Sequence, residues 1–522
     1  MSIESQGMES RSSESATPGS RSPAEGRRSS VCAGTRREFL WETGAGFTGL
    51  ALASLLARDG FAATAGGPLP VGGSTNPLAV KPAHHAAKAR ACIFLYMYGG
   101  PSPMDLFDYK PALQARDGEE LDIEIRRRST QKQKLLGSRR SFARHGESGL
   151  WCSDALPHVA RHMDELAVIK SLYADSFAHG SANLQMNTGR ILQGHPSLGS
   201  WLGYGLGSVN ENLPAFVVML DPRGGPIPGA ANWASGFMPA AYQGTVFRST
   251  GEAILALEGP AGTSRARQRD AVDTLAAINR LHAADRPGTS ELEARIASYE
   301  LAFQLQASAP ELLDLSGEDD RTLAAYGLYD TPGDHPLAAG RVHPLAIGPA
   351  AFGRQCLLAR RLVERGVRFV QIYSGGGHQQ QNWDAHFGIE ENLAIHCPEV
   401  DKPIAALLGD LKARGLLDST LVVWGGEFGR QPVSQGGNGR DHNPKGFTAW
   451  LAGGGVRQGV SVGETDDLGH EAVVDRHHVR DLHATILHLM GLEHEKLTFF
   501  SGGLDQRLTG VQPARPIHGV IA

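Results

Sequence analysis

The chain has 522 residues, of which 41% are hydrophobic and 20% charged, so it is long and apolar enough to bury a large core. Its formal net charge of −5 is not that of a nucleic-acid-binding protein, and we expect no nucleic-acid partner. The five cysteines lie far apart and include no Cys-x-x-Cys pair, which argues against a thiolate zinc site and a disulfide-dense scaffold.

The N-terminal segment has the features of an export signal. Residues 1–34 are rich in Ser, Arg, Glu and Gly, and we expect them to be disordered. Residues 35–65 contain the pair Arg36-Arg37, a weakly apolar region and a final Ala63-Thr64-Ala65, and they resemble a twin-arginine signal peptide with its cleavage site. The alternative is an amphipathic helix that begins at Arg36.

The apolar part of this segment is about 14 residues long, which is short of the ~20 residues that cross a bilayer. We therefore expect no permanent membrane span and a linker over residues 66–88. The twin-arginine export machinery is the expected partner of the segment, and the expected location is the periplasm or another exported compartment.

Downstream, apolar runs alternate with helical patterns, which is typical of an α/β domain with a mostly parallel sheet and helices on both faces. We expect one such doubly wound domain over residues 89–522. The predicted strands are 91–98, 166–170, 214–220, 367–373, 420–424 and 447–451, and the predicted helices lie near 154–164, 181–190, 197–206, 350–365, 388–414 and 479–490.

Two segments are predicted to be insertions in this domain. The first, near 109–147, is highly charged and is either a solvated surface or a rim that attracts anions. The second, near 264–330, is helical by composition.

Acidic residues and histidines follow several of the predicted strands. Asp105 follows the first strand, Asp384 and His386 follow strand 367–373, and Glu427 follows strand 420–424, with His442 close behind. Because ligands bind beyond the carboxyl ends of the strands in such sheets, we expect these five side chains to converge on a metal. Four of the five have an alternative: Asp105 as a helix N-cap, Asp384 and His386 as a loop pair, and Glu427 as a turn residue.

The segments Trp383-Asp384-Ala385-His386, Gly426-Glu427-Phe428-Gly429-Arg430 and Gly439-Arg440-Asp441-His442-Asn443-Pro444 resemble the exported family called domain of unknown function 1501. That family is similar to the sulfatase and alkaline phosphatase superfamily. The resemblance covers about residues 88–520. It implies an alkaline-phosphatase-like fold and a site for phosphate or sulfate esters that holds one or two divalent ions, either Zn, Mn, Mg or Ca.

The resemblance also implies where a nucleophile lies. In sulfatases a modified Cys or Ser opens a helix that ends in Thr-Gly-Arg, which here is Thr188-Gly189-Arg190. Counting back places His179 at that position, with Ser181 two residues on, and the Cys-x-Pro-Ser-Arg modification motif is absent. We therefore expect Ser181 or His179 to be catalytic. The alternative is Ser181 as an N-cap and His179 as a hydrogen-bonded loop residue.

Polar and basic residues near these motifs are candidates to bind the substrate. They are Asn183, Arg430, Arg440 and Lys445, and the three cations suit the non-bridging oxygens of an ester. The leading hypothesis is an exported metal-dependent hydrolase of phosphate or sulfate esters. Its substrate would be a small anionic ester or a sulfated or phosphorylated polymer. The alternative is a non-catalytic periplasmic binding or assembly protein that retains the fold.

Overall fold

Strand β1, Ala91–Met97, lies in the middle of a nine-stranded sheet and is buried along its whole length. In the computed structural model it pairs in parallel with β9, Phe369–Ser374, on one side and with β10, Thr420–Gly425, on the other. A central strand covered on both faces requires a continuous apolar run, and ACIFLYM supplies it.

The structure describes residues 76–522 except 126–128, 249–261, 285–289, 339–341 and 378. The predicted disordered segment 1–34, the predicted signal peptide 35–65 and the first part of the predicted linker lie outside these residues. Residues 76–88 are described, and they lie against the domain, because the Lys81 backbone N–H donates to the Leu206 carbonyl and the Lys88 N–H to the Leu489 carbonyl.

The sheet is mostly parallel, as predicted. Its order is β14, β6, β13, β10, β1, β9, β7, β8, with β17 also paired to β6. Only β13 runs opposite to its neighbours β10 and β6. The bounds of the remaining strands of this sheet are β6 Leu166–Tyr173, β7 Phe216–Met219, β8 Thr245–Phe247, β13 Phe447–Ala452, β14 Val460–Val462 and β17 His477–His478.

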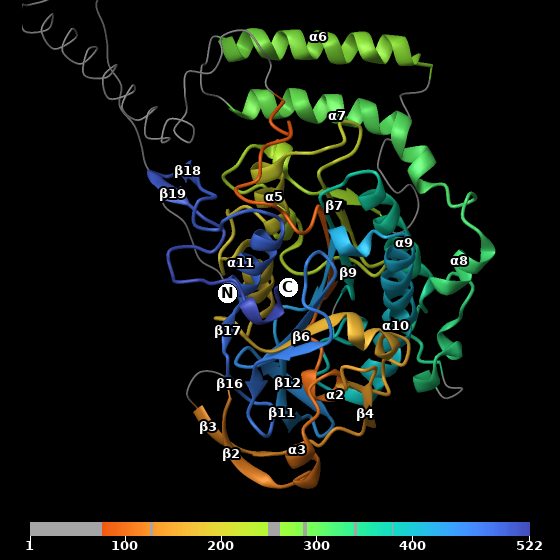
Figure 1. Cartoon of the computed structure of the whole chain (residues 1–522), viewed down its shortest axis with the longest axis vertical. Helices are drawn as coiled ribbons and strands as arrows, with labels where there is room; N and C mark the ends of the chain where they lie inside the picture. The colour runs from red at the N-terminus through yellow and green to blue at the C-terminus, as the bar shows by residue number, and fades with distance from the viewer. Residues whose placement is uncertain (1–75, 126–128, 249–261, 285–289, 339–341, 378) are drawn as a thin grey trace, which may run out of the picture. The chain divides into compact units, whose positions relative to one another are not determined.

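Helices cover both faces of the sheet, which confirms the predicted doubly wound architecture (Figure 1). Alternate residues of β1 point to opposite sides, so Leu95 joins a core with α9, Ala350–Glu364, and α10, Ile389–Ala413. Phe94 joins a second core with α5, Leu198–Leu206, and α11, Val479–Leu489.

The two predicted insertions fold as separate small elements. The charged one contains α3 Pro111–Ala115, the hairpin β2 Glu120–Ile125 with β3 Ser129–Lys134, and β4 Phe142–His145 paired with β5 Leu150–Ser153. The helical one contains α6 Arg265–Ala284, α7 Ser290–Leu313 and α8 Asp320–Ala325, and Figure 1 shows α6 and α7 lying side by side.

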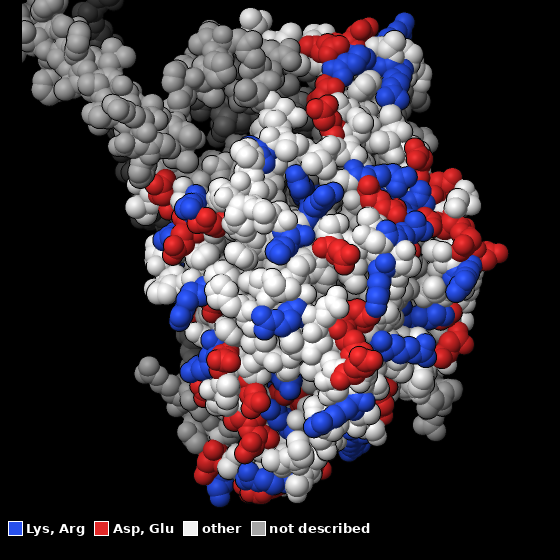
Figure 2. Space-filling model, viewed as in Figure 1, with Lys and Arg blue, Asp and Glu red and all other residues white. Residues whose placement is uncertain are grey.

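Short elements complete the described chain. They are α2 Pro103–Leu106, α4 His179–Thr188, the ribbon β11 Gly429–Gln435 with β12 Gly439–Asn443, β15 Glu464–Thr465 with β16 Ala472–Val474, and β18 Phe499–Ser501 with β19 Leu504–Gln506. Short 3-10 turns also occur, including Val159–Glu165 where a helix near 154–164 was predicted. Acidic and basic side chains are interspersed over the face drawn in Figure 2, without a large area of one sign. Among the described residues, no helix combines the length and the apolar character needed to span a bilayer.

Candidate metal centre

Four side chains from distant parts of the sequence meet beyond the carboxyl ends of the central strands: His179, Asp384, His386 and His442. One ligand atom from each lies within 4.8 Å of the others. His179 is the first residue of α4, Asp384 and His386 follow β9, and His442 belongs to β12. The side chains are 12% to 23% exposed, so the cluster is largely buried yet open to solvent.

Asp384 is the centre of the cluster. Its Oδ1 lies 3.0 Å from Nε2 of His386 and 3.0 Å from Nε2 of His442, and its Oδ2 lies 3.2 Å from Nε2 of His179. Burial alone would raise the pKa of Asp384, but the charge of Arg430 and the three imidazoles hold it far below its usual range. The side chain is therefore a carboxylate at any physiological pH.

The second nitrogen of each histidine is fixed by an acceptor. Nδ1 of His179 lies 2.6 Å from Oε1 of Glu427, and Nδ1 of His442 lies 2.7 Å from the carbonyl oxygen of Phe177. Nδ1 of His386 bonds to Oε1 of Gln435. Carbonyl and carboxylate oxygens can only accept, so each Nδ1 is placed to donate a proton, and in that tautomer the Nε2 lone pairs that face Asp384 are the candidate ligand atoms.

This arrangement suits a cation better than it suits protons. Burial and the positive charges of Arg430 and His179 lower the pKa of His442 to about 4, so the ring carries a single proton at pH 7 although both of its nitrogens face oxygen acceptors. With that proton on Nδ1, the Nε2 lone pair faces a carboxylate oxygen only 3.0 Å away, which is repulsive unless a cation is shared between the two atoms.

The spacing of the four ligand atoms also fits. A tetrahedral zinc ion with ligand distances of about 2.0–2.1 Å holds its ligand atoms about 3.3 Å apart. The three nitrogen-to-oxygen distances around Asp384 are 3.0, 3.0 and 3.2 Å. Donated Nδ1 protons are the usual way in which a protein orients histidine ligands.

His179 is more basic than an ordinary histidine. Burial lowers its pKa, but the close carboxylates of Asp384 and Glu427 more than offset this and raise the pKa to about 9. The ring of Phe428 packs 4.9 Å from the ring of His179 and 4.5 Å from that of His442, which shields both from water.

Two of the five predicted metal ligands lie outside this group of four. Glu427 is fully buried, accepts the Gly99 backbone N–H at 3.0 Å, and contacts His179 instead of joining the four converging atoms. Asp105 is also fully buried and forms an ion pair with Arg440, whose Nε lies 2.8 Å from its Oδ2. The Ser102 hydroxyl donates to the same oxygen. The ligand roles of all five remain predictions, and the structure brings three of them together with His179.

The two predicted substrate-binding arginines are wholly buried. Arg430 donates to Oδ1 of Asp384 at 2.7 Å and to the carbonyl oxygens of Gly99 and Gly100, while Arg440 pairs with Asp105. Contact of either guanidinium with a substrate stays a prediction, and it would require these bonds to be exchanged.

The other predicted site residues lie on or near α4 and β12. Asn183 is buried inside α4, where its Oδ1 accepts from the Tyr96 hydroxyl and its Nδ2 donates to the His179 carbonyl. Ser181 is the third residue of α4, partly exposed, and its hydroxyl has no hydrogen bond within the described part of the chain. Lys445 lies between β12 and β13, where its backbone N–H donates to Asn443.

The sequence reasoning did not single out Gln435 or the Phe177 carbonyl as partners of the histidines. A weak signal was available for Gln435, because it stands just before Gly436-Gly437 at the turn of the β11–β12 ribbon, beside the motif that carries His442. A backbone carbonyl leaves no signal in a sequence.

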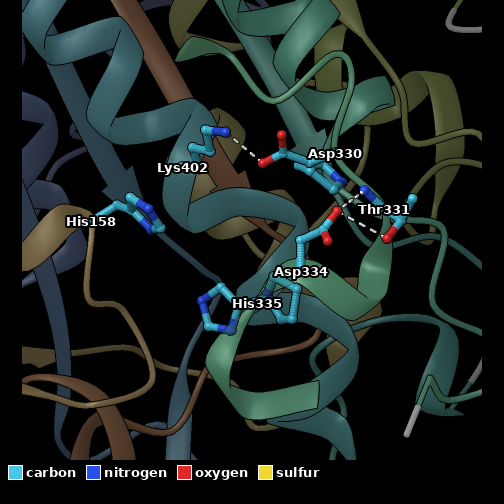
Figure 3. A pocket seen from close by; sticks show the side chains of 8 residues that line it. His158, Asp330, Thr331, Asp334, His335 and Lys402 are labelled. Atoms are coloured by element: carbon cyan, nitrogen blue, oxygen red, sulfur yellow. Dashed lines mark hydrogen bonds and ion pairs between the residues drawn. The ribbon is translucent and has the colours of Figure 1, made fainter. Parts of the chain in front are cut away.

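A second group of two histidines and an aspartate fits a metal less well. His158, His335 and Asp401 lie together beside a pocket of about 300 Å³, which Figure 3 shows with Lys402 paired to Asp330 at its rim. Nδ1 of His335 accepts the Leu337 backbone N–H, so its proton is on Nε2, which donates to Asp401. That nitrogen therefore has no lone pair for a metal.

These observations define the class of protein. It is an α/β protein with a doubly wound sheet and an aspartate–histidine cluster at the carboxyl edge of that sheet. A family model matches residues 89–521, and the chain belongs to that family, which is described as "Protein of unknown function (DUF1501)". This confirms the family resemblance seen in the sequence. A search among curated proteins found no match.

Several solved structures are similar to the chain at low identity. The lipoteichoic acid synthase LtaP from Listeria monocytogenes is 10% identical over 86% of this chain and 81% of its own, with a TM-score of 0.36. The PsFucS1 sulfatase from Pseudoalteromonas sp. is 12% identical over 78% and 68%, with a TM-score of 0.33. The alkaline phosphatase from the Antarctic bacterium TAB5 is 10% identical over 73% and 97%, with a TM-score of 0.27. At these values the similarities say nothing of activity.

Proposed function

We propose that this chain is an exported, metal-dependent hydrolase of phosphate or sulfate esters, and that His179, Asp384, His386 and His442 hold one divalent ion. The observation that carries the proposal is the set of three Nε2 atoms that face one carboxylate while their Nδ1 atoms are bound elsewhere. Such a pattern is expected of histidine ligands, because an acceptor on Nδ1 orients the ring and leaves Nε2 toward the ion.

The donor set narrows the choice of metal. Three imidazoles and one carboxylate suit zinc or another first-row transition metal, whereas magnesium and calcium prefer sites built of oxygen alone. When bound, such an ion acts as a Lewis acid toward an ester oxygen and lowers the pKa of a hydroxyl group or water beside it.

The start of α4 supplies a place for the anionic group of an ester. Its N-cap residue, Ala178, has no side chain that could bond to the first backbone N–H groups of the helix. These groups lie directly beside His179 and carry partial positive charge, so they suit a sulfate or phosphate oxygen. In this proposal the nucleophile is the hydroxyl of Ser181, which lies in the first turn of the helix and has no hydrogen bond within the described residues.

The test is to purify the exported chain without adding metal, measure its metal content, and assay p-nitrophenyl phosphate and p-nitrophenyl sulfate. We expect close to one transition-metal ion per chain, and loss of both metal and turnover in His442→Gln. Ser181→Ala should keep the metal and lose turnover, while Ser461→Ala, at an exposed position on β14, should keep both. Protein that holds no transition metal after native export would overturn the proposal.

The second candidate is a metal-binding protein without catalytic activity, which acts in periplasmic binding or assembly. It is favoured by one observation: Arg430 and Arg440, the cations expected to neutralise the ester, are engaged in internal bonds. Full metal occupancy with no turnover of either ester class, in wild type and Ser181→Ala alike, would favour this candidate.

A further inference from the structure

Three arginines that belong to neither histidine cluster lie around the contact between α4 and α11. Arg190 follows the C-terminal end of α4, Arg480 is the second residue of α11, and Arg507 follows β19. The two helices are in contact along this stretch, because Nε2 of His483 bonds to the Met186 carbonyl of α4 at 2.7 Å.

The start of α11 lies at the same edge of the sheet as the metal centre. Strand β17 runs parallel to β6, and its last residue, His478, is in register with Tyr173, the last residue of β6. Helix α11 begins directly afterwards, with His478 as its N-cap. Since β6, β9 and β10 all run in the same direction, Arg480 and Asp384 both follow carboxyl ends of strands.

Two of the three guanidinium groups have no acidic partner among the described residues. The guanidinium of Arg190 packs against Gly510, where any side chain would collide with its Nη1 atom. Arg507 belongs to the same turn, because its carbonyl accepts the Gly510 N–H at 3.2 Å. Both side chains are partly exposed, so both can reach a ligand from solvent.

Arg480 is only loosely paired. Its Nη2 lies 3.5 Å from Oδ2 of Asp175, an oxygen that also bonds to His478 at 3.1 Å and to Gln185. Burial lowers the pKa of Arg190, and the positive charges of Arg480 and Arg507 act in the same direction, in keeping with their places around this contact.

Arginines that gather around one helix contact without a full counter-charge suit an anion, because the guanidinium fork matches the oxygens of sulfate and phosphate. We propose that Arg190, Arg480 and Arg507 form a second anion-binding subsite, which holds a sulfate or phosphate group of a polyanionic polymer.

The position of the subsite indicates a polymer instead of a small ester. His179 and Arg190 mark the two ends of α4, a ten-residue helix that is about 15 Å long. A monoester cannot span that distance, whereas a chain with repeated charged groups can occupy both places. This part of the inference rests on the proposed function, because it takes the metal centre as the place where one ester group reacts.

The test measures binding and turnover separately on the full exported chain. Fluorescently labelled dextran sulfate and long-chain polyphosphate are titrated at low and moderate salt. The triple variant Arg190→Ala/Arg480→Ala/Arg507→Ala should bind the preferred polymer at least about tenfold more weakly, as expected for loss of charge-assisted hydrogen bonds. The polymer whose binding is weakened more by the triple variant shows whether the subsite prefers sulfate or phosphate groups.

A matched control separates the subsite from net charge. The variant Arg161→Ala/Arg267→Ala/Arg321→Ala removes three exposed arginines elsewhere and should bind both polymers like wild type. If the first triple variant does not fold, the single variants Arg190→Ala and Arg507→Ala remove side chains with no described acidic partner and should each weaken binding.

Wild-type affinity in the Arg190, Arg480 and Arg507 variants, or an equal loss in the control, would overturn the subsite. Its failure can be told apart from that of the proposed function. The variants should keep their metal content and their kcat on a small p-nitrophenyl ester, and only the KM for a polymer should rise. If the wild-type chain has neither metal nor turnover but the arginine variants still bind the polymer more weakly, the proposed hydrolase function is refuted and the proposed subsite stands.

Discussion

The buried carboxylate of Glu427 gives the sharpest test of how the candidate metal centre is built. Its Oε1 lies 2.6 Å from Nδ1 of His179, and both of its oxygens accept the Gly99 backbone N–H. In Glu427→Gln the size is kept, but one oxygen becomes an NH2 group. If that group faces His179, Nδ1 loses its acceptor and two donors meet; if it faces Gly99, two donors meet at the backbone N–H.

The expected size of the effect follows from this position beside a ligand. Loss of such a partner typically weakens metal affinity by about 10- to 100-fold. At a fixed metal concentration well above Kd, this removes about 1.4–2.7 kcal/mol of metal-dependent stabilisation. The fold should persist, because the helix and strands around Glu427 are held by the apolar cores on both faces of the sheet.

Affinity is measured by competition with a chromophoric chelator, and stability by denaturant unfolding with metal and with EDTA. The control is Glu399→Gln, which changes another buried glutamate, paired with Arg223 through Nη2 at 2.7 Å. It should lower the unfolding midpoint in both conditions and leave metal affinity unchanged. Wild-type metal affinity in Glu427→Gln would refute the positioning role, and complete loss of the metal would instead indicate that Glu427 is itself a ligand.

Two further predictions concern the surface and the N-terminus. The pKa of Asp175 is lowered from 3.8 to about 2, chiefly by its hydrogen bond with His478. The ionised side chain therefore stabilises the fold fully above the unfolded-state pKa. This stabilisation is lost as the pH falls through the folded-state pKa. The difference in unfolding free energy between wild type and Asp175→Asn should therefore be constant from pH 5 to 7 and shrink between about pH 4 and pH 2; a difference that does not change with pH would contradict it. Changing Arg36 and Arg37 to Lys should leave unprocessed precursor in the cytoplasm, as seen by fractionation and immunoblotting, and normal export of that variant would remove the twin-arginine assignment.

The positions of the main strands could be predicted because each is an apolar run with a clear end. The prediction that Asp384, His386 and His442 would approach one another rested on a general property of parallel sheets, and the structure places them together. The strands β8, β14 and β17 were not predicted, since two or three residues at the sheet's periphery carry too little pattern. The antiparallel direction of β13 was not predicted either, because a fully buried strand has the same apolar sequence pattern in a parallel and an antiparallel pairing.

The fold class, the edge of the sheet where chemistry-bearing residues gather, and the family could all be derived from the amino-acid order alone. Those properties follow from local apolar periodicity and from short motifs. The tertiary structure alone decided the role that each polar group can take, because that depends on partners far away in the chain. Asp105 meets Arg440 across 335 residues, and Glu427 meets His179 across 248. A histidine offers a metal the nitrogen that is not hydrogen-bonded, and a distant segment of the chain decides this by bringing an acceptor to the other nitrogen.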